Sequence, residues 1–436
     1  MDPIAALIVG LVLLCAVLIT GLPIYLGFLL LNLAGVAVFF GPAGAGMLAN
    51  SMLESMSSLN MTLIPLFVLM GEVLFRSGAV DVVFESVDRL IGRIRGRLYV
   101  FTIALSTVFG ALCGSAVAVV SMLGRTVLPA MVKRGYDIEL SAAMIQGGAS
   151  LAPIIPPSLL AVIIGSMAGV SISSLLIAGI APGLLLALMS IGYAYWALWR
   201  NPRLAPSDDA PDAAPRISLT RAFLQMLPFS IIIFSVLGVI LLGVATPSEA
   251  AATGVLGSLA TAAIYRRLSW RMVKDSVAST MRISTMILII VATSVLFGQL
   301  LAFTGATART VEWFTMLDLP PLVMFWLMMT VPFVLCMFID QMAFMLVAIP
   351  IYTPLVESLN FDPIWFWTMF SINMTLASLT PPFGYTMFAL RAAAPEIITL
   401  KQVFDSSWPI TWVFVLGMVI MTAVPQIVTF LPALLK

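Results

Sequence analysis

Long stretches of apolar residues, separated by short polar segments, follow one another along almost the whole chain. Many of them have the length of about 17–25 residues that an α-helix needs to cross a bilayer. They are continuous, without the alternation of apolar and polar positions that marks the strands of a membrane barrel. The stretches lie at residues 4–20, 23–44, 60–76, 98–131, 138–168, 174–199, 222–243, 247–264, 283–303, 320–357, 364–393 and 410–433. This pattern predicts an all-α polytopic membrane protein.

Two of the stretches, 98–131 and 320–357, are too long for one crossing helix and too short for two. Within the first, the arms 98–113 and 118–131 would each be about 24 Å long at most. Neither arm then comfortably crosses a hydrocarbon core of about 30 Å. We therefore predict that both stretches are re-entrant hairpins, which enter the membrane and return to the side they left.

The chain resembles itself when it is shifted by 225 residues, so that residues 129–157 fall on residues 354–382. The proline doublet Pro156-Pro157 then coincides with Pro381-Pro382. Other coincidences are Pro129 with Pro354, Asp137 with Asp362, Met144 with Met369, Ser150 with Thr375, and Leu151-Ala152 with Leu376-Ala377. Five predicted crossings separate the doublets, and an odd number inverts the second copy. Inverted repeats with interrupted helices are typical of secondary transporters.

The repeat divides the chain into two halves with the same predicted elements on either side of a linker. The linker is rich in Pro, Asp and Ala, and we expect it to be a flexible cytoplasmic connection. The predicted divisions are a first inverted repeat at 1–200 (scaffold helices, hairpin 98–131, broken helix 138–168), the linker at 201–221, and a second inverted repeat at 222–436 (scaffold helices, hairpin 320–357, broken helix 364–393).

Each proline doublet is expected to break its helix near the middle of the membrane. Proline has no backbone donor, and it disfavours helical geometry in the residue before it. The carbonyl groups that such a break frees cannot face lipid, so they must line a cavity or bind a ligand. A dehydrated cation such as Na⁺ suits them, and four hydroxyls supplement them: Ser150, Ser158, Thr375 and Thr380. A simple kink is the alternative for each proline pair.

The hairpins carry the other polar groups expected inside the membrane. Gly114 and Ser115 form the first tip, and Asp340 is an acid at the second. Because an unpaired carboxylate is costly to bury in lipid, an intramembrane acid indicates a function. We expect Asp340 to compensate bound Na⁺, and a solvated turn beside a water-filled vestibule is the alternative. Arg125 in the first hairpin either attracts an anionic substrate or extends toward the cytoplasm, and the sequence favours neither.

Two further polar positions have structural explanations. Glu72 and Gln299 coincide when the chain is shifted by 227 residues. A hydrogen bond between helices explains that pair as well as a function does. Thr246 and Glu249, on either side of Pro247, have the spacing of a capping box at the start of a helix. We expect a cap there.

The composition excludes several functions. Hydrophobic residues make up 61% of the 436 residues and charged residues only 9%, whereas soluble domains carry about 25% charged residues. With 21 Lys+Arg against 20 Asp+Glu, the chain has no basic field for nucleic acid. It lacks histidine, and Cys15, Cys113 and Cys336 all lie in apolar stretches, which indicates no disulfide framework. With no catalytic dyad or metal cluster in view, we do not expect an enzyme. A purely structural subunit would not need inverted repeats with broken helices.

The distribution of positive charge predicts the orientation. If both hairpins return to the side they left, 18 of the 21 Lys and Arg residues share one side, which is then cytoplasmic. Arg309 and Lys436 lie on the opposite side, so both termini face outward. Met1-Asp2-Pro3 supplies no basic region, and residues 4–20 are therefore expected to be a mature helix and not a signal peptide.

Motifs distributed over nearly the whole chain carry a family resemblance. They are Gly114-Ser115, residues 128–136, Ser150-Leu151-Ala152-Pro153-Ile154-Ile155-Pro156-Pro157-Ser158, residues 168–183, residues 245–251, and Leu379-Thr380-Pro381-Pro382-Phe383-Gly384. Together they resemble the large membrane subunit of tripartite ATP-independent periplasmic (TRAP) transporters, the DctM-like family. Two departures are Cys113, where the family often has serine, and Ala152, where it has glycine.

The resemblance implies a Na⁺-driven importer in the cytoplasmic (inner) membrane, in which a mobile domain with hairpins and broken helices moves against a scaffold like an elevator. Na⁺ is then the coupling ion, without an organic cofactor. The implied partners are a small TRAP membrane subunit, an extracytoplasmic substrate-binding protein, membrane lipid and an anionic organic substrate of the carboxylate or dicarboxylate type. The implied Na⁺-site residues are Gly114, Ser115, Ser150, Pro153, Pro156, Ser158, Asp340, Thr375, Thr380, Pro381 and Gly384.

One alternative within transport stays open. A stand-alone Na⁺/anion symporter or exchanger of related architecture would work without a binding protein. Because residues 4–20 open the large subunit directly, the small subunit is expected to be a separate chain. The identity of the organic acid does not follow from the sequence, since the binding protein largely selects it in this family.

Overall fold

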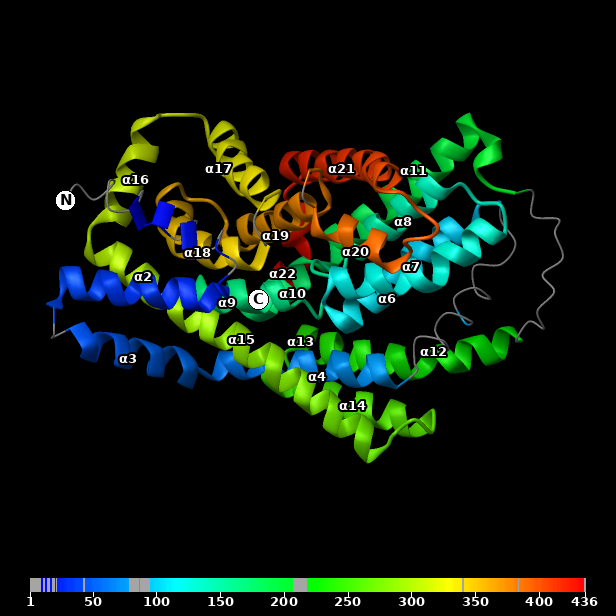
Figure 1. Ribbon diagram of the computed structural model, residues 1–436, viewed down its shortest axis with the longest axis horizontal. Helices are drawn as coiled ribbons and strands as arrows, with labels where there is room; N and C mark the ends of the chain where they lie inside the picture. The colour runs from blue at the N-terminus through cyan, green and yellow to red at the C-terminus, as the bar shows by residue number, and fades with distance from the viewer. Residues whose placement is uncertain are drawn as a thin grey trace.

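The computed structural model describes residues 9–434 apart from 11, 14–15, 18–19, 21, 42–43, 78–85, 87–94, 207–217, 339–340 and 383. Every regular element in this part of the chain is a helix (Figure 1). The first half contains α2 (Ile24–Phe39), α3 (Gly44–Ser57), a 3-10 turn (Leu59–Thr62), α4 (Leu63–Arg76), α6 (Arg97–Cys113), α7 (Ala116–Lys133), α8 (Ile138–Ala149), α9 (Leu159–Met167), α10 (Ile172–Ala178), α11 (Ile180–Arg200) and a 3-10 turn (Pro202–Leu204).

The second half contains α12 (Leu219–Ile233), a π-helical segment (Phe234–Gly238), α13 (Val239–Leu241), α14 (Pro247–Ile264), α15 (Trp270–Phe303), α16 (Ala306–Met316), α17 (Pro321–Cys336), α18 (Gln341–Ser358), α19 (Pro363–Leu379), α20 (Tyr385–Ala393), α21 (Leu400–Ala423) and α22 (Gln426–Ala433). The all-α prediction is therefore confirmed. The predicted stretch 4–20 and the predicted linker at 201–221 lie largely outside the described residues.

Among the described residues, six helical segments are long and apolar enough to cross a membrane. They are Leu59–Arg76, Ala116–Lys133, Ile172–Arg200, Phe223–Leu241, Trp270–Phe303 and Leu400–Ala423. The prediction of a polytopic membrane protein is confirmed. The expectation that neither arm of the first hairpin comfortably crosses the membrane is wrong for α7, because that helix runs from Ala116 to Lys133, two residues beyond the predicted arm 118–131 at each end. The re-entrant form of both hairpins stays a prediction.

Several helix ends differ from the predicted apolar stretches. α15 begins at Trp270 and not near residue 283, because Ser269 caps it and its charged first turns are helical. The prediction of one helix over 410–433 is also wrong, since α21 ends at Ala423 and α22 follows as a separate helix. α3 and α16 are not predicted at all. Hydropathy records contact with lipid, whereas helix ends depend on caps and packing.

The two broken helices begin in the same way. The Oδ1 atom of Asp137 accepts a hydrogen bond from the backbone N–H three residues further on, at 2.8 Å. Asp362 Oδ1 accepts the equivalent bond, also at 2.8 Å. These two aspartates coincide in the predicted repeat. The predicted capping box at Thr246 and Glu249 is also confirmed, with both of its reciprocal hydrogen bonds present.

Corresponding helices of the two halves make corresponding contacts. α6 packs on α8 as α17 packs on α19, and α7 packs on α20 as α18 packs on α9. Both arms of each hairpin therefore touch the broken helix of their own half, and the second arm also touches that of the other half. α14 and α15 pack on α4 along the lower part of Figure 1, and α4 and α15 also contact α6 and α18 of the hairpins. These contacts follow the predicted repeat, and its inversion stays a prediction.

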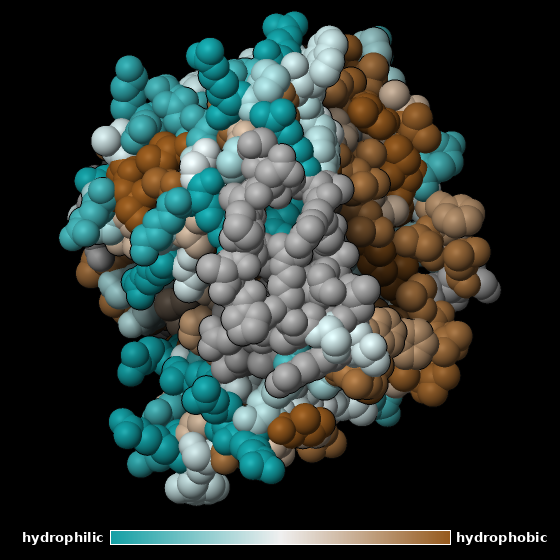
Figure 2. Space-filling view, turned by 90° about the vertical axis from the view of Figure 1, so that its right-hand side faces the viewer, coloured by the Kyte–Doolittle hydropathy of each residue, from teal (hydrophilic) through white to brown (hydrophobic). Residues whose placement is uncertain are grey.

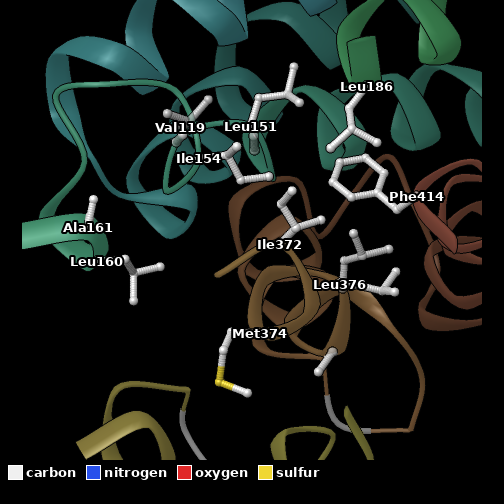
Figure 3. Packing of buried hydrophobic residues seen from close by; sticks show 14 of the residues in the cluster. Val119, Leu151, Ile154, Leu160, Ala161, Leu186, Ile372, Met374, Leu376 and Phe414 are labelled. Atoms are coloured by element: carbon white, nitrogen blue, oxygen red, sulfur yellow. The ribbon is translucent and has the colours of Figure 1, made fainter. Parts of the chain in front are cut away.

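A continuous apolar core joins the halves. Around the first proline break, Leu151 and Ile154 lie toward Ile372 and Leu376 of α19 (Figure 3). At the end of the molecule where α11 ends, Arg95 Nη2 donates to the carbonyl of Pro202 at 2.5 Å. Figure 2 shows this end, where hydrophilic residues cover much of the surface beside an apolar flank.

Candidate functional site

The first proline doublet interrupts its helix as predicted, with residues 150–158 between α8 and α9. Ser158 Oγ accepts a hydrogen bond from the N–H of Ala161 at 3.2 Å and donates to the carbonyl of Pro153. Ser150 is fully buried and donates to the carbonyl four residues before it at 2.9 Å. A hydroxyl that donates in this way keeps its oxygen lone pairs. The loop thus carries hydroxyl and carbonyl oxygens without a charged side chain.

The tip of the first hairpin lies against this break. Gly114 has a left-handed φ of 62° at the end of α6, and Ser115 Oγ caps α7. A Cβ atom on Gly114 would lie 3.6 Å from the carbonyl oxygen of Pro157, and one on Gly110 would lie 2.7 Å from Cα of Ala152. Glycine at position 110 therefore permits this close approach without displacing the backbone of Ala152. The structure therefore brings the first tip and the first break together.

The second doublet also interrupts its helix, with residues 380–384 between α19 and α20. Thr380 is buried, and its Oγ1 donates to a carbonyl one turn earlier at 2.7 Å. Thr375 lies inside α19 and donates in the same way at 2.9 Å. A Cβ atom on Gly384 would lie 2.7 Å from the carbonyl oxygen of Ser378. This break is more compact than the first.

A cavity of about 570 Å³ lies between the hairpins, the first break and the neighbouring helices. It is lined by the first hairpin tip, by Pro153 and by the starts of α9, α18 and α20. Its other lining residues come from α4 and α15, and most of the lining is apolar. Glu72 on α4 is the single charged side chain among the described lining residues. The volume suits a small organic molecule.

Four helix N-termini reach this cavity, two from each half of the chain. The lining residues concerned are Ala116, Val117 and Ala118 of α7, Leu159 and Leu160 of α9, Gln341 and Met342 of α18, and Tyr385 of α20. Helix N-termini carry N–H groups without intrahelical partners and a partial positive charge. The cavity can therefore hold an anionic group although no Lys or Arg is found among the lining residues that the structure describes.

The predicted site residues divide into two groups. Those that line the cavity are Gly114, Ser115 and Pro153. Those in the breaks but not among its lining residues are Ser150, Pro156, Ser158, Thr375, Thr380, Pro381 and Gly384. Arg125 is exposed on α7 and is not a lining residue either. Asp340 lies outside the described residues.

Two polar lining residues, Gln341 and Tyr385, are not among those predicted from the sequence. Gln341 is only 7% exposed. Its place beside Asp340 at a predicted hairpin tip was the one sequence feature that could have identified Gln341 as a site residue. Glu72 is recognisable in the sequence as a repeat position, but its contact with the cavity depends on how α4 packs against the hairpins.

Comparison with known proteins gives consistent matches. The family model described as the DctM component of tripartite ATP-independent periplasmic transporters matches residues 11–427. The chain is 30% identical over 373 residues to the ectoine/5-hydroxyectoine TRAP transporter large permease protein of Ruegeria pomeroyi, covering 85% of this chain and 86% of that protein. It is 27% identical over 402 residues to the C4-dicarboxylate TRAP transporter large permease protein of Pseudomonas aeruginosa, covering 91% of each.

A solved structure shares the fold. The YdaH transporter of Alcanivorax borkumensis superposes with a TM-score of 0.61 at 15% identity, covering 88% of this chain and 89% of that one. The family match spans the described helices, so the protein is a multi-pass inner-membrane permease and not an enzyme. Membership implies a small membrane subunit and a substrate-binding protein as partners. The chain belongs to the DctM family of TRAP transporter large permeases.

Proposed function

We propose that this chain uses a Na⁺ gradient to import a small organic acid, as the large permease subunit of a TRAP transporter. The observation that carries the proposal is the meeting of four helix N-termini at one cavity beside a hairpin tip and a proline break. In secondary transporters, such N-termini face the anionic group of the substrate, and unwound carbonyls coordinate the coupling ion. Both requirements have candidates at this cavity.

The substrate side of the proposal rests on the helix N-termini. A carboxylate beside them accepts N–H bonds and neutralises their partial positive charge. The names of the two relatives give ectoine and C4-dicarboxylates as first compounds to test. A binding protein delivers the acid from outside, and the small membrane subunit completes the permease.

The Na⁺ side of the proposal rests on the two breaks. Gly114, Ser115 and the carbonyls of residues 150–158 form one candidate site, where the Pro157 carbonyl lies beside the tip. Residues 380–384 and Asp340 of the second hairpin form the other. Hard cations prefer oxygen ligands, and hydroxyls such as Thr380 that donate to the main chain retain lone pairs for this purpose.

The transport step is an elevator movement. The cavity lies where the hairpins and broken helices meet α4 and α15. We propose that the hairpins and broken helices move as one body against α4 and α15 and carry the acid and Na⁺ together. The corresponding contacts of α7 with α20 and of α18 with α9 tie both hairpins into that body.

Reconstituted uptake tests this function. Proteoliposomes with the large and small subunits, given a binding protein, are expected to accumulate labelled ectoine or succinate under an inward Na⁺ gradient and not under a K⁺ gradient. Asp340→Ala is expected to abolish Na⁺-dependent uptake while the protein still folds. Uptake that is equal in Na⁺ and K⁺ would refute the coupling. Uptake at the full rate without any binding protein would favour the stand-alone symporter or exchanger.

A further inference from the structure

The cavity contains hydrogen-bond acceptors as well as the N–H groups of the helix ends. Glu72 on α4 and Gln341 at the start of α18 both line it. Neither residue belongs to the predicted Na⁺ sites. The cavity therefore offers donors from four helix ends and acceptors from two side chains, and a bound molecule has to satisfy both kinds.

Glu72 brings a negative charge to the cavity. Its Oε2 atom pairs with Nε of Arg76, one turn further along α4, at 3.0 Å. Arg76 itself is not among the described lining residues. The second carboxylate oxygen of Glu72 makes no hydrogen bond to a described residue. The pair thus leaves an acceptor with partial negative charge for a ligand.

Gln341 contributes a buried acceptor to the cavity. Its Oε1 atom is buried without a hydrogen bond to any residue that the structure describes, and the side chain is 7% exposed. A buried acceptor without a donor is destabilising, because the hydrogen bonds that it made to water are not replaced. A ligand that donates a hydrogen bond at this point removes the cost, whereas another carboxylate does not.

We propose that the organic acid carried by this permease is a zwitterion. Its carboxylate lies at the helix N-termini, and its positively charged N–H group lies toward Glu72 and Gln341. This substrate class rests on the proposed function, because it describes the same cavity. A dicarboxylate fits less well, since its second carboxylate would meet the like charge of Glu72 and would offer Gln341 Oε1 no donor.

Ligand-dependent thermal stability distinguishes the classes without relying on the selectivity of a binding protein. The purified large and small subunits in nanodiscs are titrated with ectoine, γ-aminobutyrate, succinate or isethionate, in NaCl and in KCl. In NaCl the two zwitterions are expected to raise the unfolding temperature at concentrations at least about tenfold below those that the two plain anions require. In KCl the zwitterion effect is expected to be much smaller.

Matched variants locate the positive group. Glu72→Gln and Gln341→Leu are each expected to raise the zwitterion concentration for half-maximal stabilisation about tenfold, with the response to Na⁺ alone unchanged. Glu54→Gln is the control, because it makes the same chemical change at an exposed position on α3. The Na⁺ response also shows whether each variant is folded, so one misfolded variant leaves the other to decide.

Each outcome has a defined meaning. Stabilisation by succinate or isethionate at concentrations equal to or below those of the zwitterions would overturn the zwitterion proposal and leave Na⁺-coupled acid import standing. Folded Glu72→Gln and Gln341→Leu variants that bind zwitterions like the unmodified protein would do the same. If no acid of either class stabilises the complex in a Na⁺-dependent way, the proposed function itself is refuted.

Discussion

The two proline breaks occupy corresponding positions in the repeat but differ in extent. In the first half the helix ends at Ala149, and residues 150–158 are unwound. In the second half Thr375, which corresponds to Ser150, is still inside α19, which continues to Leu379, and α20 begins at Tyr385. The first break therefore frees more main-chain carbonyls than the second.

Residue 153 explains the difference. Pro153 in the first half corresponds to Ser378 in the second under the same shift of 225 residues. A proline removes a backbone donor and clashes with the carbonyl one turn earlier, which favours the end of the helix before it. Ser378 continues the helix, and its Oγ donates to the carbonyl of Thr375 at 2.7 Å. The additional proline at position 153 thus accounts for the longer unwound loop of the first half.

The two breaks also differ in what holds them. The first is packed against other helices: a Cβ atom on Gly179, between α10 and α11, would lie 2.1 Å from the carbonyl oxygen of Ile154. The second is closed by nearby residues, since Thr386 Oγ1 donates to the carbonyl of Ser378 at 3.0 Å. A longer unwound loop leaves more groups for neighbouring helices to support.

The largest expected effect comes from exchanging residue types between the breaks. Ser378→Pro is expected to shorten α19 and to destabilise the protein by about 3 kcal/mol, because it places proline inside a buried helix. Pro153→Ser, the reverse exchange, is expected to fold, since serine occupies the matching place in the other half. Thermal unfolding in detergent measures both. A Ser378→Pro protein as stable as the unmodified one would contradict the explanation that Pro153 causes the longer first break.

A smaller effect is expected where the first break touches α10 and α11. Gly179→Ala is expected to cost about 1–3 kcal/mol, because its Cβ atom would displace the Ile154 carbonyl. Gly192→Ala is the control, since a Cβ atom there would meet nothing within 4 Å. The two unfolding temperatures are compared, with the Na⁺ titration of uptake as a second readout. Equal unfolding temperatures would show that the neighbouring helices do not support the first break.

The smallest expected effect concerns the N-terminal helix caps that the two halves share. Asp137→Ala and Asp362→Ala each remove one N-terminal cap with the same 2.8 Å geometry. Each is expected to cost about 1 kcal/mol, and the two losses of thermal stability should agree. Asp→Asn at either position is the control, because asparagine caps as well as aspartate. A large effect in one half and none in the other would show that the helix starts are not equivalent.

The sequence predicted the parts of the site that depend on local chemistry. Pro156 and Pro381 mark the breaks because proline sterics act over one helical turn. Gly114 was predicted at a tip, and it lies there with a left-handed backbone. The start of α15 and the separate α22 were not predicted, because apolar stretches do not record where caps and tertiary packing place helix ends.

Taken alone, the sequence determined the helical membrane class, the two interruptions and the matching positions of Asp137 and Asp362. Those features depend on hydropathy and on main-chain geometry within a few residues. Only the tertiary structure decided that four helix N-termini share one cavity with Glu72 and Gln341. These groups are far apart in the chain, and the packing of α4 and α15 against the hairpins brings them together.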